Sequence, residues 1–174
     1  NPHYTAEHAA WCMEHIFQPT IDAMAKEGRP FKGCLFFGLM LTPDGPKVIE
    51  YNCRFGDPET QVVLPRLKTD FIDIIEAVIE GRLAELTIEW EEEACACVVM
   101  ASGGYPGSYQ KGLPISGLTA DGQHPDAYAI FHAGTRLSDG QYLTNGGRVL
   151  GVTAKGATLD QALQAAYRVV ESIH

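Results

Sequence analysis

The sequence predicts an α+β fold in two parts, and two observations support this prediction. The first part combines long helical patterns with a pair of strands, whereas the second consists of short strands and glycine turns followed by one amphipathic helix. Strands followed by a helix are typical of a small antiparallel sheet that the helix covers. The acidic run at residues 91–93 indicates a solvated linker, so we predict domains at residues 1–92 and 93–174.

The first part opens with a helical pattern over residues 5–27, in which Pro19 should kink the helix or start a new one and Gly28 can close it. The apolar run at residues 33–41 predicts a buried strand. Turn-forming residues follow, and residues 47–52 return as a second strand. We therefore expect a hairpin, which is a rigid support for functional side chains.

Polar and apolar side chains alternate along the second strand and beyond it. Because successive strand residues point to opposite faces, one face should carry Glu50, Asn52 and Arg54, and the other Ile49, Tyr51 and Cys53. Carboxylate and amide oxygens suit Mg²⁺, and a guanidinium suits phosphate. The row therefore indicates a metal–phosphate site, with an ordinary half-solvated strand as the alternative.

The residues after this row favour the start of a helix. Gly56 permits a sharp turn, Asp57 can cap a helix, Pro58 fits its first position, and Glu59 places a carboxylate in its first turn. Capping is therefore an alternative to any functional role of Asp57 and Glu59. The helix should be interrupted near Pro65.

A further helix should present an apolar face over residues 71–78. In the second part, we expect strands at residues 94–101, 115–119, 127–133, 141–143 and 148–153. The last element is a helix over residues 159–173, in which Thr158 and Gln161 form a capping box.

Arg148 follows residues 145–147, which we interpret as a hairpin turn, and a cation at this place can contact an anionic substrate. Residues 103–107 are rich in glycine, but no apolar helix follows them, so we expect an ordinary loop. His132 lies inside an apolar strand, and we favour a hydrogen-bonded core or rim histidine over a metal ligand.

Composition narrows the class of protein. A formal net charge of -9 argues against nucleic acid as a partner, because phosphates require basic patches. No apolar run has the length of a membrane span, and the acidic charge argues against anionic membranes. The five cysteines lack the spacing of a zinc site, so we expect reduced thiols and a cytoplasmic compartment.

Residues 50–61, EYNCRFGDPETQ, closely resemble a motif of the phosphoribosylamine–glycine ligases, also called glycinamide ribonucleotide synthetases, which are ATP-grasp enzymes of purine biosynthesis. Residues 31–40, 47–52, 98–107, 131–135 and 144–150 resemble the same family in the same order. The resemblance implies that residues 1–92 are the carboxy-terminal portion of an ATP-grasp domain. It also implies a missing amino-terminal half of the same polypeptide, with the lid over ATP, and hence an isolated chain that is inactive.

The resemblance implies a reaction that joins glycine to 5-phosphoribosylamine at the expense of ATP. By motif position, Glu50 and Asn52 resemble the ligands of Mg²⁺ or Mn²⁺, and Arg54 resembles the cation that faces the γ-phosphate or the acyl phosphate. Asp57 and Glu59 would receive an ammonium or a ribose hydroxyl. Residues 33–41 contain no acidic residue, so the number of metal ions stays open.

Two questions stay open at this point, the role of Ile49 and the kind of protein to which the chain belongs. Ile49, which precedes the metal carboxylate, is either a residue under the adenine or a core residue. The chain is either part of the ligase or a truncated paralogue that serves as a binding or assembly module. A third possibility is another ATP-grasp ligase with a different carboxylate substrate, against which residues 56–59 and the motifs of the second part argue.

Overall fold

The structure, a computed structural model, describes residues 3–174 and divides them into two compact units. Unit 1 contains the described residues up to Gly56 together with Phe71–Thr87, and unit 2 contains Asp57–Asp70 and Ile88–His174. Both units combine helices with antiparallel strands, which confirms the α+β class. The domain boundary at residues 92 and 93 stays a prediction.

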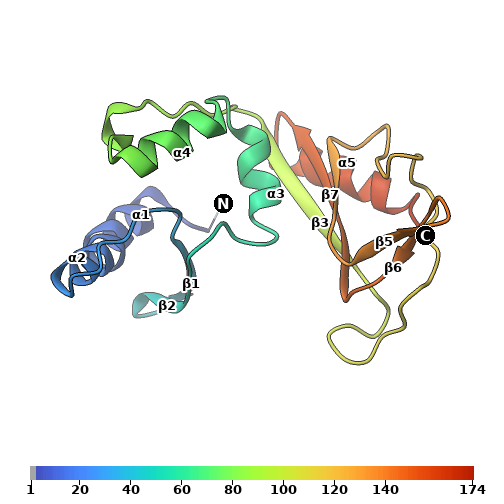
Figure 1. The fold of residues 1–174 in the computed structure, drawn as a ribbon, viewed down its shortest axis with the longest axis horizontal. Helices are drawn as coiled ribbons and strands as arrows, with labels where there is room; N and C mark the ends of the chain where they lie inside the picture. The colour runs from blue at the N-terminus through green and yellow to red at the C-terminus, as the bar shows by residue number, and fades with distance from the viewer. Residues whose placement is uncertain (1–2) are drawn as a thin grey trace. The chain divides into compact units, whose positions relative to one another are not determined.

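Unit 1 begins with helix α1 (Ala6–Cys12), a π-helical turn (Met13–Phe17) and helix α2 (Gln18–Lys26), drawn in blue in Figure 1. Pro19 lies in the first turn of α2 and cannot donate a backbone hydrogen bond, which agrees with the predicted alternative that a new helix starts at this proline. Gly28 has a φ of 75° and follows the helix, as expected for a helix end. Thr5 caps α1 in a capping box with His8, which the sequence analysis did not recognise because His replaces the usual Glu or Gln.

The hairpin of unit 1 consists of β1 (Phe36–Thr42) and β2 (Gly45–Asn52), which pair antiparallel. The helices cover one face of it, where the Phe37 ring lies 4.5 Å from the Phe17 ring. The sequence predicted a buried strand, and this prediction is wrong, because β1 is only partly buried and Met40 is exposed. A two-stranded sheet with helices on one face leaves its other face open.

The helix predicted to begin at Pro58 begins instead at Thr60, as α3 (Thr60–Val63), and passes at Leu64–Arg66 into a 3₁₀ turn. The predicted interruption near Pro65 is therefore confirmed. Helix α4 (Phe71–Glu80) and the 3₁₀ turn Leu83–Glu85 return the chain to unit 1.

Unit 2 is built on a three-stranded antiparallel sheet in the order β3-β7-β4, formed by Ala94–Ala101, Arg148–Gly156 and Ala129–His132. Strands β5 (Thr135–Ser138) and β6 (Gln141–Thr144) form a separate hairpin. Helix α5 (Leu159–Val170) packs on β3 and β7, as Figure 1 shows. The antiparallel sheet with one covering helix is the arrangement that the sequence predicted.

The sequence analysis predicted one strand of unit 2 that does not form and missed another. Residues 115–119 form no strand, since their pairing with β6 is limited to an isolated bridge at Pro114 and one hydrogen bond from Ile115. The sequence analysis also missed β5, because its four residues show no long apolar alternation.

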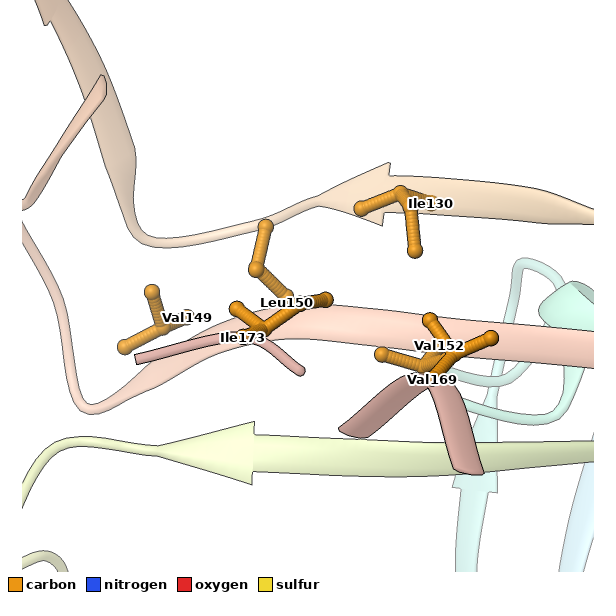
Figure 2. Packing of buried hydrophobic residues seen from close by; sticks show 6 residues of the cluster. All are labelled: Ile130, Val149, Leu150, Val152, Val169 and Ile173. Atoms are coloured by element: carbon orange, nitrogen blue, oxygen red, sulfur yellow. The ribbon is translucent and has the colours of Figure 1, made fainter. Parts of the chain in front are cut away.

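The core of unit 2 lies between the sheet and α5. Figure 2 shows its largest cluster, in which Val149, Leu150 and Val152 of β7 meet Ile130 of β4 and Val169 and Ile173 from the end of the chain. The predicted helix over residues 159–173 ends at Val170, and Thr158 caps it by accepting a hydrogen bond from the Gln161 backbone N–H. The side-chain bond that would complete the predicted capping box is not formed between these two residues.

Candidate functional site

The first candidate pair, Glu50 and Asn52, lies at the end of β2 in unit 1. The Asn52 side-chain N–H donates a hydrogen bond of 3.0 Å to Glu50 Oε1, so the structure brings these two predicted ligands together. Glu50 stands opposite Gly38 of β1, and a Cβ at Gly38 would lie 2.8 Å from Glu50 Cγ. The missing side chain of Gly38 therefore makes the space in which the Glu50 carboxylate lies.

These two side chains fit a divalent cation by their chemistry. Glu50 offers carboxylate oxygens and Asn52 an amide oxygen, which are hard ligands on a paired strand. Among the residues that the structure describes, no three His, Cys, Asp or Glu side chains gather as a complete metal site. A cation at Glu50 and Asn52 would therefore need further oxygen ligands from phosphate or water.

The predicted alternation of faces fails at Ile49. In the pairing of the hairpin, Gly38 meets Glu50 and Leu39 meets Val48, so Ile49 is an extra residue in a β-bulge. Ile49 is 62% exposed, which excludes the core interpretation in unit 1 as the structure describes it.

Contrary to the sequence prediction, Arg54 does not lie in line with Glu50 and Asn52 on one face of the strand. Strand β2 ends at Asn52 and the chain bends at Cys53 and Arg54, so the period of two no longer applies there. The Arg54 guanidinium donates a 2.9 Å hydrogen bond through Nη1 to the Phe55 carbonyl. Its other N–H groups are not bonded to Glu50 or Asn52 in the described structure.

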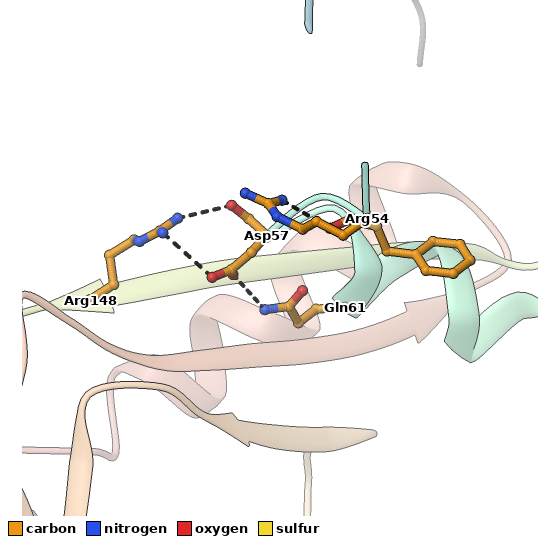
Figure 3. A network of polar contacts seen from close by, with 5 residues as sticks. Arg54, Asp57, Gln61 and Arg148 are labelled. Atoms are coloured by element: carbon orange, nitrogen blue, oxygen red, sulfur yellow. Dashed lines mark hydrogen bonds and ion pairs between the residues drawn. The ribbon is translucent and has the colours of Figure 1, made fainter. Parts of the chain in front are cut away.

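The second candidate pair, Asp57 and Arg148, lies in unit 2, and Figure 3 shows its contacts. Arg148 Nη2 lies 3.4 Å from Asp57 Oδ2, and Arg148 Nη1 donates a 2.9 Å hydrogen bond to the Asp57 carbonyl. The side-chain amide of Gln61 donates a 2.9 Å bond to Asp57 Oδ1. Two residues that the sequence singled out separately, 91 positions apart, thus form one polar cluster.

The alternative in which Asp57 caps the helix is wrong, because its carboxylate contacts the side chains of Gln61 and Arg148. The residue at the cap position of α3 is Glu59, whose side chain makes no capping bond. The Glu59 carbonyl accepts from the backbone N–H groups of Val62 and Val63.

Arg148 follows a segment that is held tightly rather than a free hairpin turn. Residues 145–147 connect β6 to β7, which belong to different sheets, so the hairpin prediction for this turn is wrong. Ser102 binds the segment, since its backbone N–H donates to the Gly147 carbonyl and its hydroxyl to the Gly146 carbonyl, both at 2.8 Å. Glycine is required because a Cβ at Gly146 would lie 2.8 Å from Gly134 Cα.

His132 is a hydrogen-bonded structural residue, as the sequence analysis favoured. Its Nε2 lies 2.8 Å from the Gly122 carbonyl oxygen and its Nδ1 lies 2.9 Å from Thr135 Oγ1. Both ring nitrogens are therefore engaged, and neither is directed to a metal.

An apolar groove of about 560 Å³ lies in unit 1, on the face of β2 that Glu50 and Asn52 do not share. Residues of α2 such as Met24 and the strand residues Val48 and Tyr51 line it.

Within residues 3–174, no helix has the length and apolar character that a membrane crossing requires.

Comparison with known proteins agrees with this arrangement. The model of the phosphoribosylglycinamide synthetase ATP-grasp (A) domain matches residues 1–60, and that of the phosphoribosylglycinamide synthetase C domain matches residues 95–174. The fold and the candidate site thus define a chain with an ATP-grasp portion and a terminal α+β domain. The chain belongs to the phosphoribosylglycinamide synthetase family.

Individual relatives show the same relationship. A phosphoribosylamine–glycine ligase of Caldanaerobacter subterraneus subsp. tengcongensis is 49% identical over 99% of this chain and 40% of its own length. That of Synechocystis sp. is 52% identical over 92% of the chain and 38% of its own length. The crystal structure of the Thermotoga maritima phosphoribosylamine–glycine ligase superposes with a TM-score of 0.79 at 34% identity, covering 100% of this chain and 42% of that protein. The chain thus spans about 40% of the length of these relatives.

Proposed function

We propose that the chain forms the carboxy-terminal part of an ATP-dependent ligase that joins glycine to 5-phosphoribosylamine in purine biosynthesis. The observation that carries the proposal is the Glu50–Asn52 pair, set opposite Gly38 inside the segment that matches the ATP-grasp domain. The names of the relatives supply the reaction.

In this proposal, Glu50 and Asn52 hold Mg²⁺ or Mn²⁺. The Asn52 amide would turn its oxygen toward the cation in exchange for its present bond to Glu50. When bound, the ion would contact the phosphate oxygens of ATP and offset the charge that spreads over the transferred phosphoryl group. Arg54, with donors left beyond its bond to Phe55, would face the γ-phosphate or the acyl phosphate.

The proposed reaction has two steps. A carboxylate oxygen of glycine attacks the γ-phosphorus of ATP, the bond from this phosphorus to the bridging oxygen breaks, and ADP leaves. The amine of 5-phosphoribosylamine then attacks the carbonyl carbon of glycyl phosphate, and phosphate leaves as the amide forms and the nitrogen loses a proton. Both steps require that anions be held close together, which fixed cations and oriented donors achieve.

The remaining candidate residues would bind substrates. Arg148 would receive an anionic group, and Asp57 and Glu59 an ammonium or a ribose hydroxyl. Ile49, exposed at the bulge next to Glu50, would pack under the adenine of ATP. The rest of a longer polypeptide would supply the lid over ATP, so the chain alone would be inactive. The proposed compartment is the cytoplasm.

The test is a steady-state assay of a protein of the relatives' length that contains this chain. We expect release of ADP from MgATP that requires both glycine and 5-phosphoribosylamine. Glu50→Gln should lower turnover by about 100-fold or more, as expected when a group that stabilises developing charge is lost. Glu14→Gln, at an exposed residue of the π-helical turn, is the matched control and should keep full activity.

Each of the following results would contradict one part of the proposal. Near-normal turnover of Glu50→Gln would exclude Glu50 from the metal site. Activity with a different carboxylate instead of glycine would indicate another ATP-grasp ligase, and no consumption of ATP at all would indicate a binding module. Turnover by the 174-residue chain alone would contradict its predicted inactivity.

A further inference from the structure

Gln61 lies where helix α3 packs on strand β7 of unit 2, and neither the sequence motifs nor the proposed reaction gives it a role. Its carbonyl oxygen accepts a 3.2 Å hydrogen bond from the hydroxyl of Thr153, which is 0% exposed. Its side chain passes close to Gly151, where a Cβ would lie 3.8 Å from Gln61 Cγ. Gln61 is therefore anchored to the buried centre of β7.

The orientation of the Gln61 amide is fixed by its partner. Its Nε2 donates to Asp57 Oδ1, and the reversed amide would place two oxygens against each other. Gln61 Oε1 is buried and has no hydrogen-bond partner in the described structure, so the amide makes only this one side-chain bond. Leaving a buried oxygen without a partner costs free energy, which the hydrogen bond to a carboxylate must offset.

Asp57 does not act as an ordinary helix cap here. The Gln61 backbone N–H donates to the Pro58 carbonyl, at 3.2 Å, rather than to the Asp57 carboxylate. The Asp57 carboxylate instead contacts Gln61 Nε2 through one oxygen and Arg148 Nη2 through the other. Both oxygens are thus engaged, and the plane of the carboxylate is set from the Gln61 side.

Arg148 is held at one edge only. Asp57 contacts both terminal nitrogens of the guanidinium, through its carboxylate and its carbonyl. A guanidinium has five N–H donors, so donors remain beyond these two contacts. The Arg148 side chain is 44% exposed, which leaves these donors accessible to an anion.

We propose that Gln61 is a positioning residue, which holds Asp57 and through it orients Arg148 to bind the phosphate group of the sugar-phosphate substrate. The chain of contacts runs from Thr153 in the core through Gln61 and Asp57 to Arg148, as Figure 3 shows for its last three members. This inference rests on the proposed function, which supplies the phosphate-bearing substrate.

The kinetic test uses a protein of the relatives' length that contains this chain, with the variants Gln61→Glu and Gln61→Met. Both remove the N–H donor, and Gln61→Glu adds a charge that repels Asp57. We expect the KM for 5-phosphoribosylamine to rise about tenfold, the effect of losing one hydrogen bond to a charged group. The kcat and the KM for ATP should stay within about twofold, because only binding of one substrate is lost.

The chain offers a matched control in α2. Gln18 Nε2 donates to Asp22 Oδ1 at 2.8 Å, which is the same pair of groups within four positions, in a helix that carries no residue of the proposed reaction. Gln18→Glu should leave all kinetic constants unchanged. Unchanged KM values in both Gln61 variants, with only a lower thermal stability, would mean that Gln61 is purely structural and would overturn the proposal.

A second measurement is independent of the reaction. Hydrogen exchange of the Arg148 Nη protons can be followed by NMR in the 174-residue chain, with the signals assigned by their loss in Arg148→Lys. We expect exchange about tenfold faster in Gln61→Glu, since one hydrogen bond to a charged group is removed from the support of Asp57. Unchanged exchange would overturn the positioning role. Faster exchange, together with no ligase activity in the protein of the relatives' length, would refute the proposed function alone.

Discussion

Gly38 and Glu50 are cross-strand neighbours. Adding one methyl group at Gly38 therefore tests the candidate metal site. A Cβ at Gly38 would lie 2.8 Å from Glu50 Cγ, which is too close for two carbon atoms that are not bonded. Gly38→Ala should therefore displace the Glu50 side chain from its place beside Asn52. In a protein of the relatives' length, we expect turnover to fall by about 100-fold, as for other small misplacements of a catalytic group.

The measurement for Gly38→Ala is the dependence of turnover on Mg²⁺ and Mn²⁺ concentration, which should shift to higher concentration. Gly103→Ala is the control, since a Cβ there meets no atom within 4 Å. Wild-type metal dependence in Gly38→Ala would mean that the Glu50 carboxylate does not need the space opposite Gly38.

At the scale of residues, the sequence predicted local relationships and missed distant ones. The proximity of Glu50 and Asn52 follows from the period of two in a strand. The prediction fails at Ile49, because a bulge is set by the pairing of two strands and not by the pattern of one. The pairing of Asp57 with Arg148 could not be predicted from any local pattern.

At the scale of elements, strand β3 carries two cysteines, Cys95 and Cys97, whose titration should make the stability of unit 2 depend on pH. Burial raises the pKa of the Cys97 thiol, and the Asp57 carboxylate adds to the rise while a hydrogen bond with Thr153 opposes it. Burial also raises the pKa of Cys95, against the attraction of Lys155. Both thiols thus resist ionisation in the folded state.

The sign of the pH effect follows from these raised pKa values. Their contribution to stability is fully present below the thiol pKa of the unfolded chain, about 8.5, and is lost as the pH rises through the folded values. We expect the free energy of unfolding of the wild type to fall between pH 8 and pH 10 more steeply than that of Cys97→Ala. Urea denaturation at several pH values measures this, and parallel curves would contradict it.

Secondary structure was predictable where the sequence has a long period and clear end signals. The helix start at Pro19 and the amphipathic pattern of α5 are signals of this kind. The strand expected at residues 115–119 did not form, because its apolar residues Ile115 and Leu118 pack on the core of unit 2 without joining the sheet. Burial of apolar side chains alone does not distinguish a strand from a packed loop.

For the whole molecule, the two units differ in how many apolar side chains they bury. Unit 2 contains the cluster around Leu150 and Val152, in which strands and α5 bury one another. In the described part of unit 1, the buried apolar side chains are limited to those of Cys12, Ile16, Pro46 and Ala77. Buried apolar area is the main source of folding free energy, so unit 2 should be the more stable unit.

Unit 1 also exposes large apolar side chains on α4 and on the hairpin. Ile72 and Ile79 of α4 and Met40, Ile49 and Tyr51 of the hairpin are all more than half exposed. Exposed apolar residues on neighbouring elements commonly mark surfaces that another part of a protein covers. The relatives have more than twice this length, and under the proposed function the additional polypeptide would cover these residues.

Hydrogen exchange of backbone amides tests this difference between the units. In the 174-residue chain, we expect the amides of β7 to exchange orders of magnitude more slowly than those of β1 and β2, because few buried contacts oppose local opening of unit 1. In a protein of the relatives' length, the hairpin should gain protection while β7 changes little. Equal protection of both units in the 174-residue chain would show that unit 1 is stable without further covering, and the exposed apolar residues would then need another explanation.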